Sequence, residues 1–130
     1  MDTQEQIEYW LELAEYDLGT AKAMQQTARY LHVGFMCQQV VEKALKAAIA
    51  KTGTIPLKTH DLPKLADLAN LTKYMDETQK QLLKELYPLN TEARYSSYKE
   101  AVARGLNKHV CEEHIIQTEE MLTWIKEKLR

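Results

Sequence analysis

Residues 30–51 constrain the fold most, because they predict a helix that is apolar over most of its circumference. At about 100° per residue, its apolar side chains cover an arc of roughly 220°. These side chains are Met36, Cys37, Val40, Val41, Ala44, Leu45, Ala47, Ala48 and Ile49. The remaining narrow strip is polar and consists of Gln38, Gln39, Glu42, Lys43 and Lys46. A helix with so small a polar face is enclosed by other helices. We therefore predict that residues 30–51 form the central helix of an all-α fold.

Further helices are predicted on both sides of this segment from apolar repeats and capping residues. They cover about residues 4–27, 62–69, 77–87 and 107–129. Thr3 with Gln6 predicts a capping box at the start of the first helix. The expected N-caps of the later helices are Asp61, Asp76 and Asn107. Residues 89–106 are the least regular segment. The pattern predicts an up-down bundle of four to five helices.

The length and composition are typical of one compact domain, which we assign to residues 1–130. Cys37 and Cys111 fall on apolar helix faces, where a free thiol behaves as a small hydrophobe. Unpaired cysteines favour a reducing compartment. No stretch approaches the ~20 apolar residues that a membrane span needs. We therefore expect a soluble, cytoplasmic protein.

The charge pattern argues against a protein that coats nucleic acid through bulk electrostatics, because the net charge is only −2. The distribution is uneven: the first helix is acidic, whereas residues 94–108 are mostly basic. Charges that suit helix ends and ordinary solvated faces explain this distribution as well as a binding surface does.

Motifs for common cofactors and metals are missing from the sequence. It contains no Gly-rich phosphate loop, no cysteine pairs at zinc spacing and no His-Glu-x-x-His helix. His109 and His114 are five positions apart, so we expect them on different faces of the last helix, where they make a poor metal pair. We therefore predict neither a metal nor a cofactor.

Arg104 and His109 are candidate catalytic residues. A histidine can act as general acid or base on a ribose 2′-hydroxyl while an arginine holds the phosphate, so this pair could cleave RNA without a metal. The same spacing also arises readily by chance in a chain with 4 histidines. The pair therefore leaves catalysis open.

The irregular segment also holds candidate ligand-binding residues in Arg94, Tyr95 and Tyr98. A guanidinium beside phenol rings can bind a phosphate and stack a base. Alternatively, Arg94 pairs with a carboxylate of the central helix such as Glu42. Both interpretations remain possible, because a structural arginine in a cleft is also a ready anion site.

The polar strip of the central helix supplies the other ligand-binding candidates, which are Gln39, Glu42, Lys43 and Lys46. Glu42 and Lys46, four positions apart, also suit a simple stabilising pair, with their neighbours solvated. However, strongly apolar flanks would push these polar groups into a groove between helices. His60, just before Asp61, is a further ligand-binding candidate or a local capping device.

Taken together, these segments resemble a HEPN domain, the family named for nucleotide binding in higher eukaryotes and prokaryotes. The matching residues are Trp10, Ala14, Asp17, Leu18 and Ala21, then Gln39, Glu42, Lys43, Leu45 and Lys46, then His60, Asp61 and Leu62, and finally Ala93, Arg94 and Tyr95. The resemblance implies a helical bundle, frequent homodimerisation and frequent pairing with a small nucleotidyltransferase encoded nearby, often as a toxin and antitoxin.

Many members of that family are metal-independent ribonucleases with an Arg followed, after a short spacer, by a His. Arg94 stands at the expected place, but residues 98–101 contain no His. Arg104 and His109 keep the spacing, but Gly105 replaces the usual polar residue. The resemblance is thus to an Arg-Tyr subgroup, for which we predict a non-catalytic module that binds a nucleotide, RNA or a nucleotidyltransferase. The alternatives are a metal-independent endoribonuclease that uses Arg104 and His109, and a structural helical adaptor.

Overall fold

The computed structural model describes residues 1–90 and 105–130, and these residues contain helices and no strand. The elements in chain order are α1 (Thr3–Gln26), α2 (Tyr30–Lys51), α3 (Leu62–Leu68), the short 3₁₀ helix η1 (Thr72–Tyr74), α4 (Glu77–Leu86) and α7 (Lys108–Lys128). The predicted all-α bundle is confirmed. The 3₁₀ helix was not predicted, because three residues carry no periodic signal.

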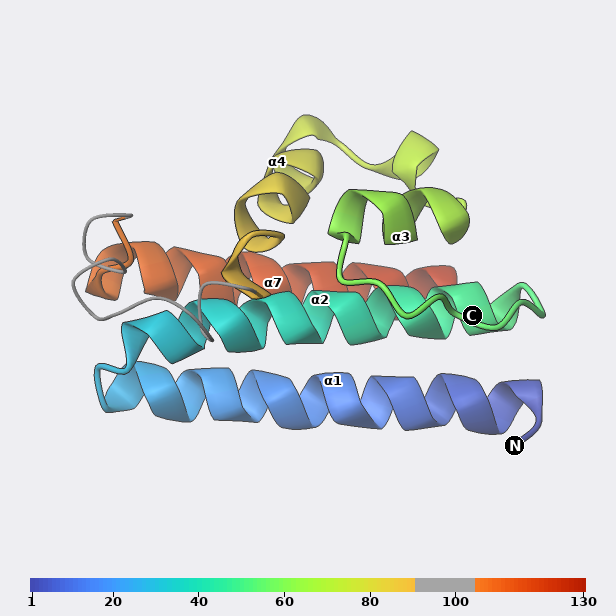
Figure 1. Cartoon of the computed structure of the whole chain (residues 1–130), viewed down its shortest axis with the longest axis horizontal. Helices are drawn as coiled ribbons and strands as arrows, with labels where there is room; N and C mark the ends of the chain where they lie inside the picture. Colours follow the sequence, from blue (N-terminus) through green and yellow to red (C-terminus); the bar gives the residue numbers. More distant parts are fainter. Residues whose placement is uncertain (91–104) are drawn as a thin grey trace.

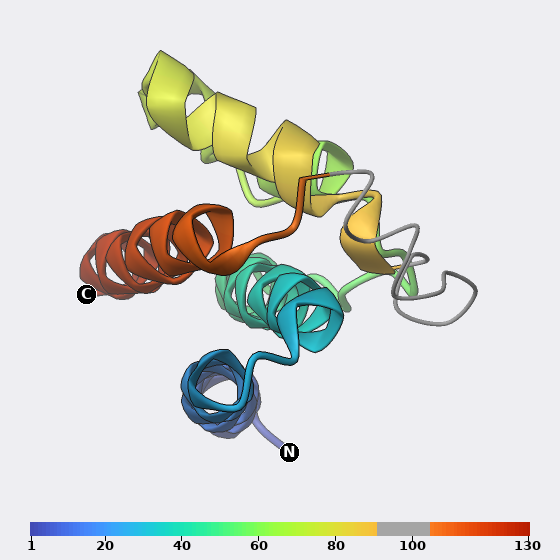
Figure 2. The same ribbon diagram turned by 90° about the vertical axis from the view of Figure 1, so that its left-hand side faces the viewer.

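The helix α2 is the centre of the molecule, as its wide apolar arc predicts (Figures 1 and 2). Of its 22 residues, 14 are buried. It contacts α1, α3, α4 and α7. The long helices α1 and α2 run antiparallel, whereas α7 runs in the same direction as α2 (Figure 1). The short helices α3 and α4 lie on the side of α2 that faces away from α1 (Figure 1).

The start of α1 differs from the sequence prediction. Asp2, not Thr3, is the N-cap, because Asp2 Oδ1 accepts a hydrogen bond of 2.8 Å from the backbone N–H of Glu5. The carboxylate also suits the positive end of the helix dipole better than a threonine hydroxyl does. Gln6 does not complete a capping box; its amide donates to the backbone oxygen of Met1. The predicted caps Asp61, Asp76 and Asn107 are confirmed.

Both cysteines are part of the core. Cys37 and Cys111 are fully buried and form no disulfide. Burial raises the pKa of Cys37 to about 12 and that of Cys111 to about 11. The two thiols therefore stay protonated at neutral pH and pack as small apolar groups, as their positions predict. Within the described part of the chain, no helix is both long enough and apolar enough to cross a membrane.

Two helical glycines offer a matched test of packing around α2. A Cβ at Gly34 would lie 2.9 Å from Cδ1 of Leu89 and 3.6 Å from Cδ1 of Leu106, whereas a Cβ at Gly19 meets nothing within 4 Å. We expect Gly19→Ala to raise the free energy of unfolding by about 0.5–1 kcal/mol through helix propensity alone. Gly34→Ala should gain less than Gly19→Ala, because the end of the Leu89 side chain has to shift to admit the new methyl group. Thermal unfolding of both variants measures the difference; equal stabilities would contradict the close approach at Gly34.

Candidate functional site

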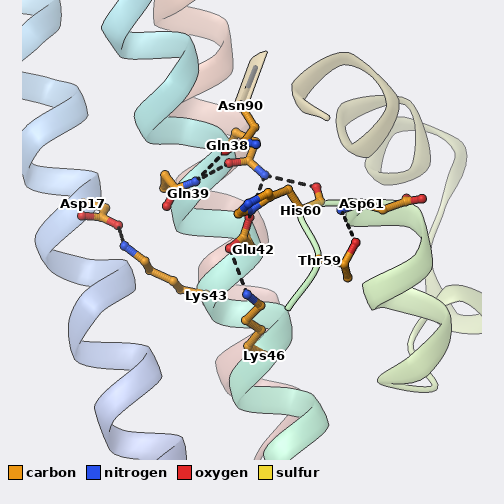
Figure 3. Close-up of polar contacts among 10 residues, drawn as sticks. All are labelled: Asp17, Gln38, Gln39, Glu42, Lys43, Lys46, Thr59, His60, Asp61 and Asn90. Atoms are coloured by element: carbon orange, nitrogen blue, oxygen red, sulfur yellow. Dashed lines mark hydrogen bonds and ion pairs between the residues drawn. The ribbon is translucent and has the colours of Figure 1, made fainter. Parts of the chain in front are cut away.

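The polar strip of α2 lies between helices and is centred on the carboxylate of Glu42 (Figure 3). Glu42 is only 4% exposed. Its Oε1 accepts a 3.0 Å hydrogen bond from Nε2 of Gln38 and lies 2.7 Å from Nδ1 of His60. Its Oε2 lies 3.1 Å from Nζ of Lys46. The predicted pair of Glu42 and Lys46 is confirmed, and it belongs to a larger buried network.

This network keeps Glu42 ionised. Burial alone would raise the pKa of Glu42, but the hydrogen bonds from Gln38, His60 and Lys46 together outweigh it and leave the pKa below its usual value. Both carboxylate oxygens are therefore already occupied by groups of the protein itself. In this arrangement Glu42 holds Gln38, His60 and Lys46 in place.

The other residues of the strip extend the network to neighbouring segments (Figure 3). Lys43 forms an ion pair with the buried Asp17 of α1. Nε2 of Gln39 donates to Oε1 of Gln38 at 2.7 Å and to Oδ1 of Asn90 at 3.2 Å. The side chains of the strip thus contact three separate parts of the chain, which are α1, the loop before α3 and residue 90. Of the two interpretations of this strip, the structure matches the one in which apolar flanks push the polar groups between helices.

His60 links the loop before α3 to this network. Its backbone oxygen accepts from Nε2 of Gln38 at 3.3 Å, and its ring contacts Glu42, although the side chain is 48% exposed. The N-cap of α3 is its neighbour Asp61, which accepts from the backbone N–H of Lys64. His60 therefore joins the loop to α2 through contacts that a local capping role would not provide.

Sequence reasoning left Gln38, Asp17 and Asn90 out of the candidate residues. Gln38 could have been found, because Gln38, Glu42 and Lys46 follow one another at intervals of four residues and so share one helix face. Asp17 and Asn90 had no such signal, since they come from distant parts of the chain.

A cavity of about 500 Å³ lies beside the start of α7; we call it the α4–α7 cavity. Its lining residues are Glu85, Leu89, Leu106, His109, Val110, Glu113, His114 and Gln117. His109 is exposed and His114 is buried, yet both reach this cavity despite their spacing of five. The expectation that they lie on different faces is therefore only partly met. Within residues 1–90 and 105–130, no three or more potential ligand side chains gather as a metal site would need.

Arg94, Tyr95, Tyr98 and Arg104 lie outside the described residues. Their predicted contacts, including a pairing of Arg94 with Glu42, therefore stay predictions. Leu89 and Leu106, which flank this segment in sequence, both line the α4–α7 cavity.

The buried His114 predicts a pH dependence of stability. Burial lowers its pKa, and the nearby Glu85 acts in the opposite direction without cancelling the effect. The unfolded chain, with a histidine pKa of about 6.5, binds the proton more readily than the folded protein does. Stability should therefore fall as the pH drops from about 6.5 towards the lower folded pKa. Denaturant unfolding at several pH values in this range should show that the free energy of unfolding depends less on pH in His114→Gln than in the parent protein. His32→Gln, a change at an exposed site, should leave the pH dependence as it is in the parent protein.

The comparison with family models and the comparison with solved structures point to the same family. The model of the HEPN domain family matches residues 7–129. Among solved structures, the archaeal HEPN homologue ST0689 is similar with 26% identity and a TM-score of 0.75, over 95% of this chain and 98% of that chain. The protein TT1696 from Thermus thermophilus is similar with 25% identity and a TM-score of 0.78, again over 95% and 98%. No curated protein matches. The chain therefore belongs to the HEPN domain family, and this membership supports a nucleotide-related or ribonuclease-type module.

Proposed function

We propose that this chain is a non-catalytic HEPN binding module that takes a nucleotide, or one nucleotide unit of an RNA, into the α4–α7 cavity. The observation that carries the proposal is the mixed lining of this cavity. Leu89, Leu106 and Val110 supply apolar surface, while Glu113 and Gln117 supply polar groups. A base needs both, because its faces are apolar and its edges carry hydrogen-bond donors and acceptors.

The charges of the cavity decide which part of a nucleotide it suits. Glu85 and Glu113 would repel a phosphate but can accept hydrogen bonds from the amino and imino groups of a base. The phosphate therefore needs a cation from elsewhere. We assign that role to Arg94, whose guanidinium can make two parallel bonds to a phosphate, with Tyr95 and Tyr98 as stacking partners.

In this proposal the polar strip of α2 supports the site. Gln39 bonds Asn90, which directly precedes the segment that carries Arg94. The Glu42 network in turn fixes Gln38, which holds Gln39. The further sequence candidates Lys43, Lys46 and His60 belong to the same support, since each is paired with a carboxylate.

The test is binding of AMP and of a single-stranded oligoribonucleotide, measured by isothermal titration. Arg94→Lys should weaken binding by about tenfold, because a point charge replaces the bidentate fork. Gln117→Ala should also weaken it, whereas the matched control Gln4→Ala, on exposed α1 surface, should not. If Arg94→Lys unfolds the protein without a ligand effect, Arg94 is a structural residue. If neither probe binds, the structural adaptor becomes the better interpretation.

A metal-independent ribonuclease is the second candidate, because His109 is exposed in the first turn of α7 at the α4–α7 cavity. Against it, Gly105 has φ +80°, a conformation that favours glycine over the polar residue usual after the catalytic arginine. We expect no RNA cleavage above background by the purified protein in chelator. Cleavage that survives chelator and disappears in His109→Ala would make the nuclease the first candidate.

We also propose that the chain forms a symmetric homodimer, as HEPN domains often do. Exposed apolar side chains such as Tyr16 and Ile116 are consistent with a further interface. Light scattering at micromolar concentration should give twice the chain mass of 15.1 kDa, and a monomer mass would refute the proposal.

A small nucleotidyltransferase encoded nearby, as in toxin and antitoxin pairs, is the proposed partner; its co-purification with this chain tests that pairing.

A further inference from the structure

A second cavity of about 360 Å³ lies between α1, α2 and the loop that follows α2; we call it the Trp10 cavity. Its lining residues are Met1, Gln6, Tyr9, Trp10, Lys46, Ile55, Pro56, Leu57 and Lys58. The N-terminus of α1 and the loop after α2 lie at one end of the bundle, whereas α7 begins at the other end (Figure 1). The Trp10 cavity is therefore separate from the α4–α7 cavity.

The apolar walls of this cavity suit a flat ring. The rings of Tyr9 and Trp10 meet edge to face, with centroids 5.5 Å apart, on the α1 side. Ile55 and Leu57 line the same cavity from the loop and are 81% and 48% exposed. When an aromatic ring packs against such exposed apolar side chains, apolar surface is removed from water, and this burial favours binding. The volume also lies within the range of small-molecule sites.

The charge of the cavity is positive. Lys46 and Lys58 line it, and no carboxylate does. The Nζ of Lys46 is held 3.1 Å from Glu42 and 5.5 Å from the centroid of the Trp10 ring, so its position is fixed and its charge is partly neutralised. Lys58 is exposed on the loop, and no ion pair involves it within the described part of the chain. Lys58 is therefore the group available to an anion.

We propose that the Trp10 cavity binds a planar aromatic anion, with its ring packed against Tyr9 and Trp10 and its acidic group at Lys58. This second site goes beyond the proposed function, which concerns the α4–α7 cavity. An uncharged ring would use only the apolar walls, and an inorganic anion would use only Lys58. The site therefore prefers a molecule that combines both groups.

The tryptophan content of the chain allows a local test. The chain contains 2 tryptophans, so the variant Trp124→Phe leaves Trp10 as the sole tryptophan reporter. AMP is the probe, with adenosine and inorganic phosphate as its two halves. We expect saturable quenching of Trp10 by AMP, about tenfold weaker binding of adenosine and no response to phosphate. Quenching that rises linearly with AMP, without saturation, would overturn the proposal.

Two further variants locate the anion. In the Trp124→Phe background, Lys58→Gln should remove the advantage of AMP over adenosine. Lys64→Gln, the same change at an exposed lysine of α3, should leave it intact. Equal effects of the two changes would contradict the role of Lys58. Gln117→Ala, which alters the α4–α7 cavity, should leave the quenching of Trp10 by AMP unchanged. This result separates failure of the Trp10 site from failure of the α4–α7 site. Loss of the quenching in Gln117→Ala would overturn an independent second site.

Discussion

Glu42→Gln is expected to lower the free energy of unfolding by about 3–5 kcal/mol, because it leaves a buried lysine without its counter-charge. The side chains of Lys46 and Glu42 are 9% and 5% exposed, so water does little to replace the lost interaction. The substitution keeps the size of the side chain, and the loss therefore measures charge and hydrogen bonding. Urea unfolding of the variant and the parent protein gives the difference.

Two controls make this result specific. Glu119→Gln breaks the exposed pair of Glu119 with Lys22 and should cost less than about 1 kcal/mol. Adding Lys46→Met to Glu42→Gln should restore part of the lost stability, because the unpaired cation is removed as well. No recovery in the double variant would mean that the hydrogen bonds from Gln38 and His60 carry the effect.

The same network predicts a loss of stability in acid. The pKa of Glu42 is lower in the folded protein than in the unfolded chain, so its stabilising effect is complete above the unfolded value. It disappears as the pH falls through the lower folded value. Glu42→Gln should therefore be less sensitive to acid than the parent protein in this range.

Leu45→Ala is expected to cost about 2–5 kcal/mol through lost apolar contacts and the cavity left behind. Leu45 is fully buried within α2, which other helices surround. The melting temperature should fall markedly. Lys22→Ala, which removes only an exposed ion pair, should change stability by less than about 1 kcal/mol. Equal melting temperatures for these two variants would contradict the central position of α2.

The Glu42 network also bears on how this HEPN domain positions its candidate sites. One strip of α2 reaches Asn90, which precedes the Arg94 segment, and through Lys46 it reaches the wall of the Trp10 cavity. The same buried carboxylate therefore stabilises the bundle and holds groups near both cavities. We expect Glu42→Gln to weaken ligand binding at the α4–α7 cavity, because Gln38 and Gln39 lose part of their support, in addition to its effect on stability.

The sequence by itself determined the helices and the place of α2, because both follow from local patterns. Helix bounds depend on capping residues and apolar periodicity within a few residues, and Asp61, Asp76 and Asn107 were identified in this way. The apolar arc of residues 30–51 required enclosure on several sides, and burial of α2 is the result. The cap at Asp2 was missed, since Asp2 and Thr3 are both favourable N-cap residues in adjacent positions.

Only the tertiary structure decided what the polar residues do. Lys43 meets Asp17 of α1, Gln39 meets Asn90, and His60 meets Glu42, and no sequence spacing links these residues. The two cavities likewise join side chains from distant segments, such as Trp10 and Lys58 or Glu85 and His109. A helical period shows which face of a helix is polar, but the partners of that face depend on how the helices pack. The fold therefore followed from local patterns, whereas the candidate sites required the packed bundle.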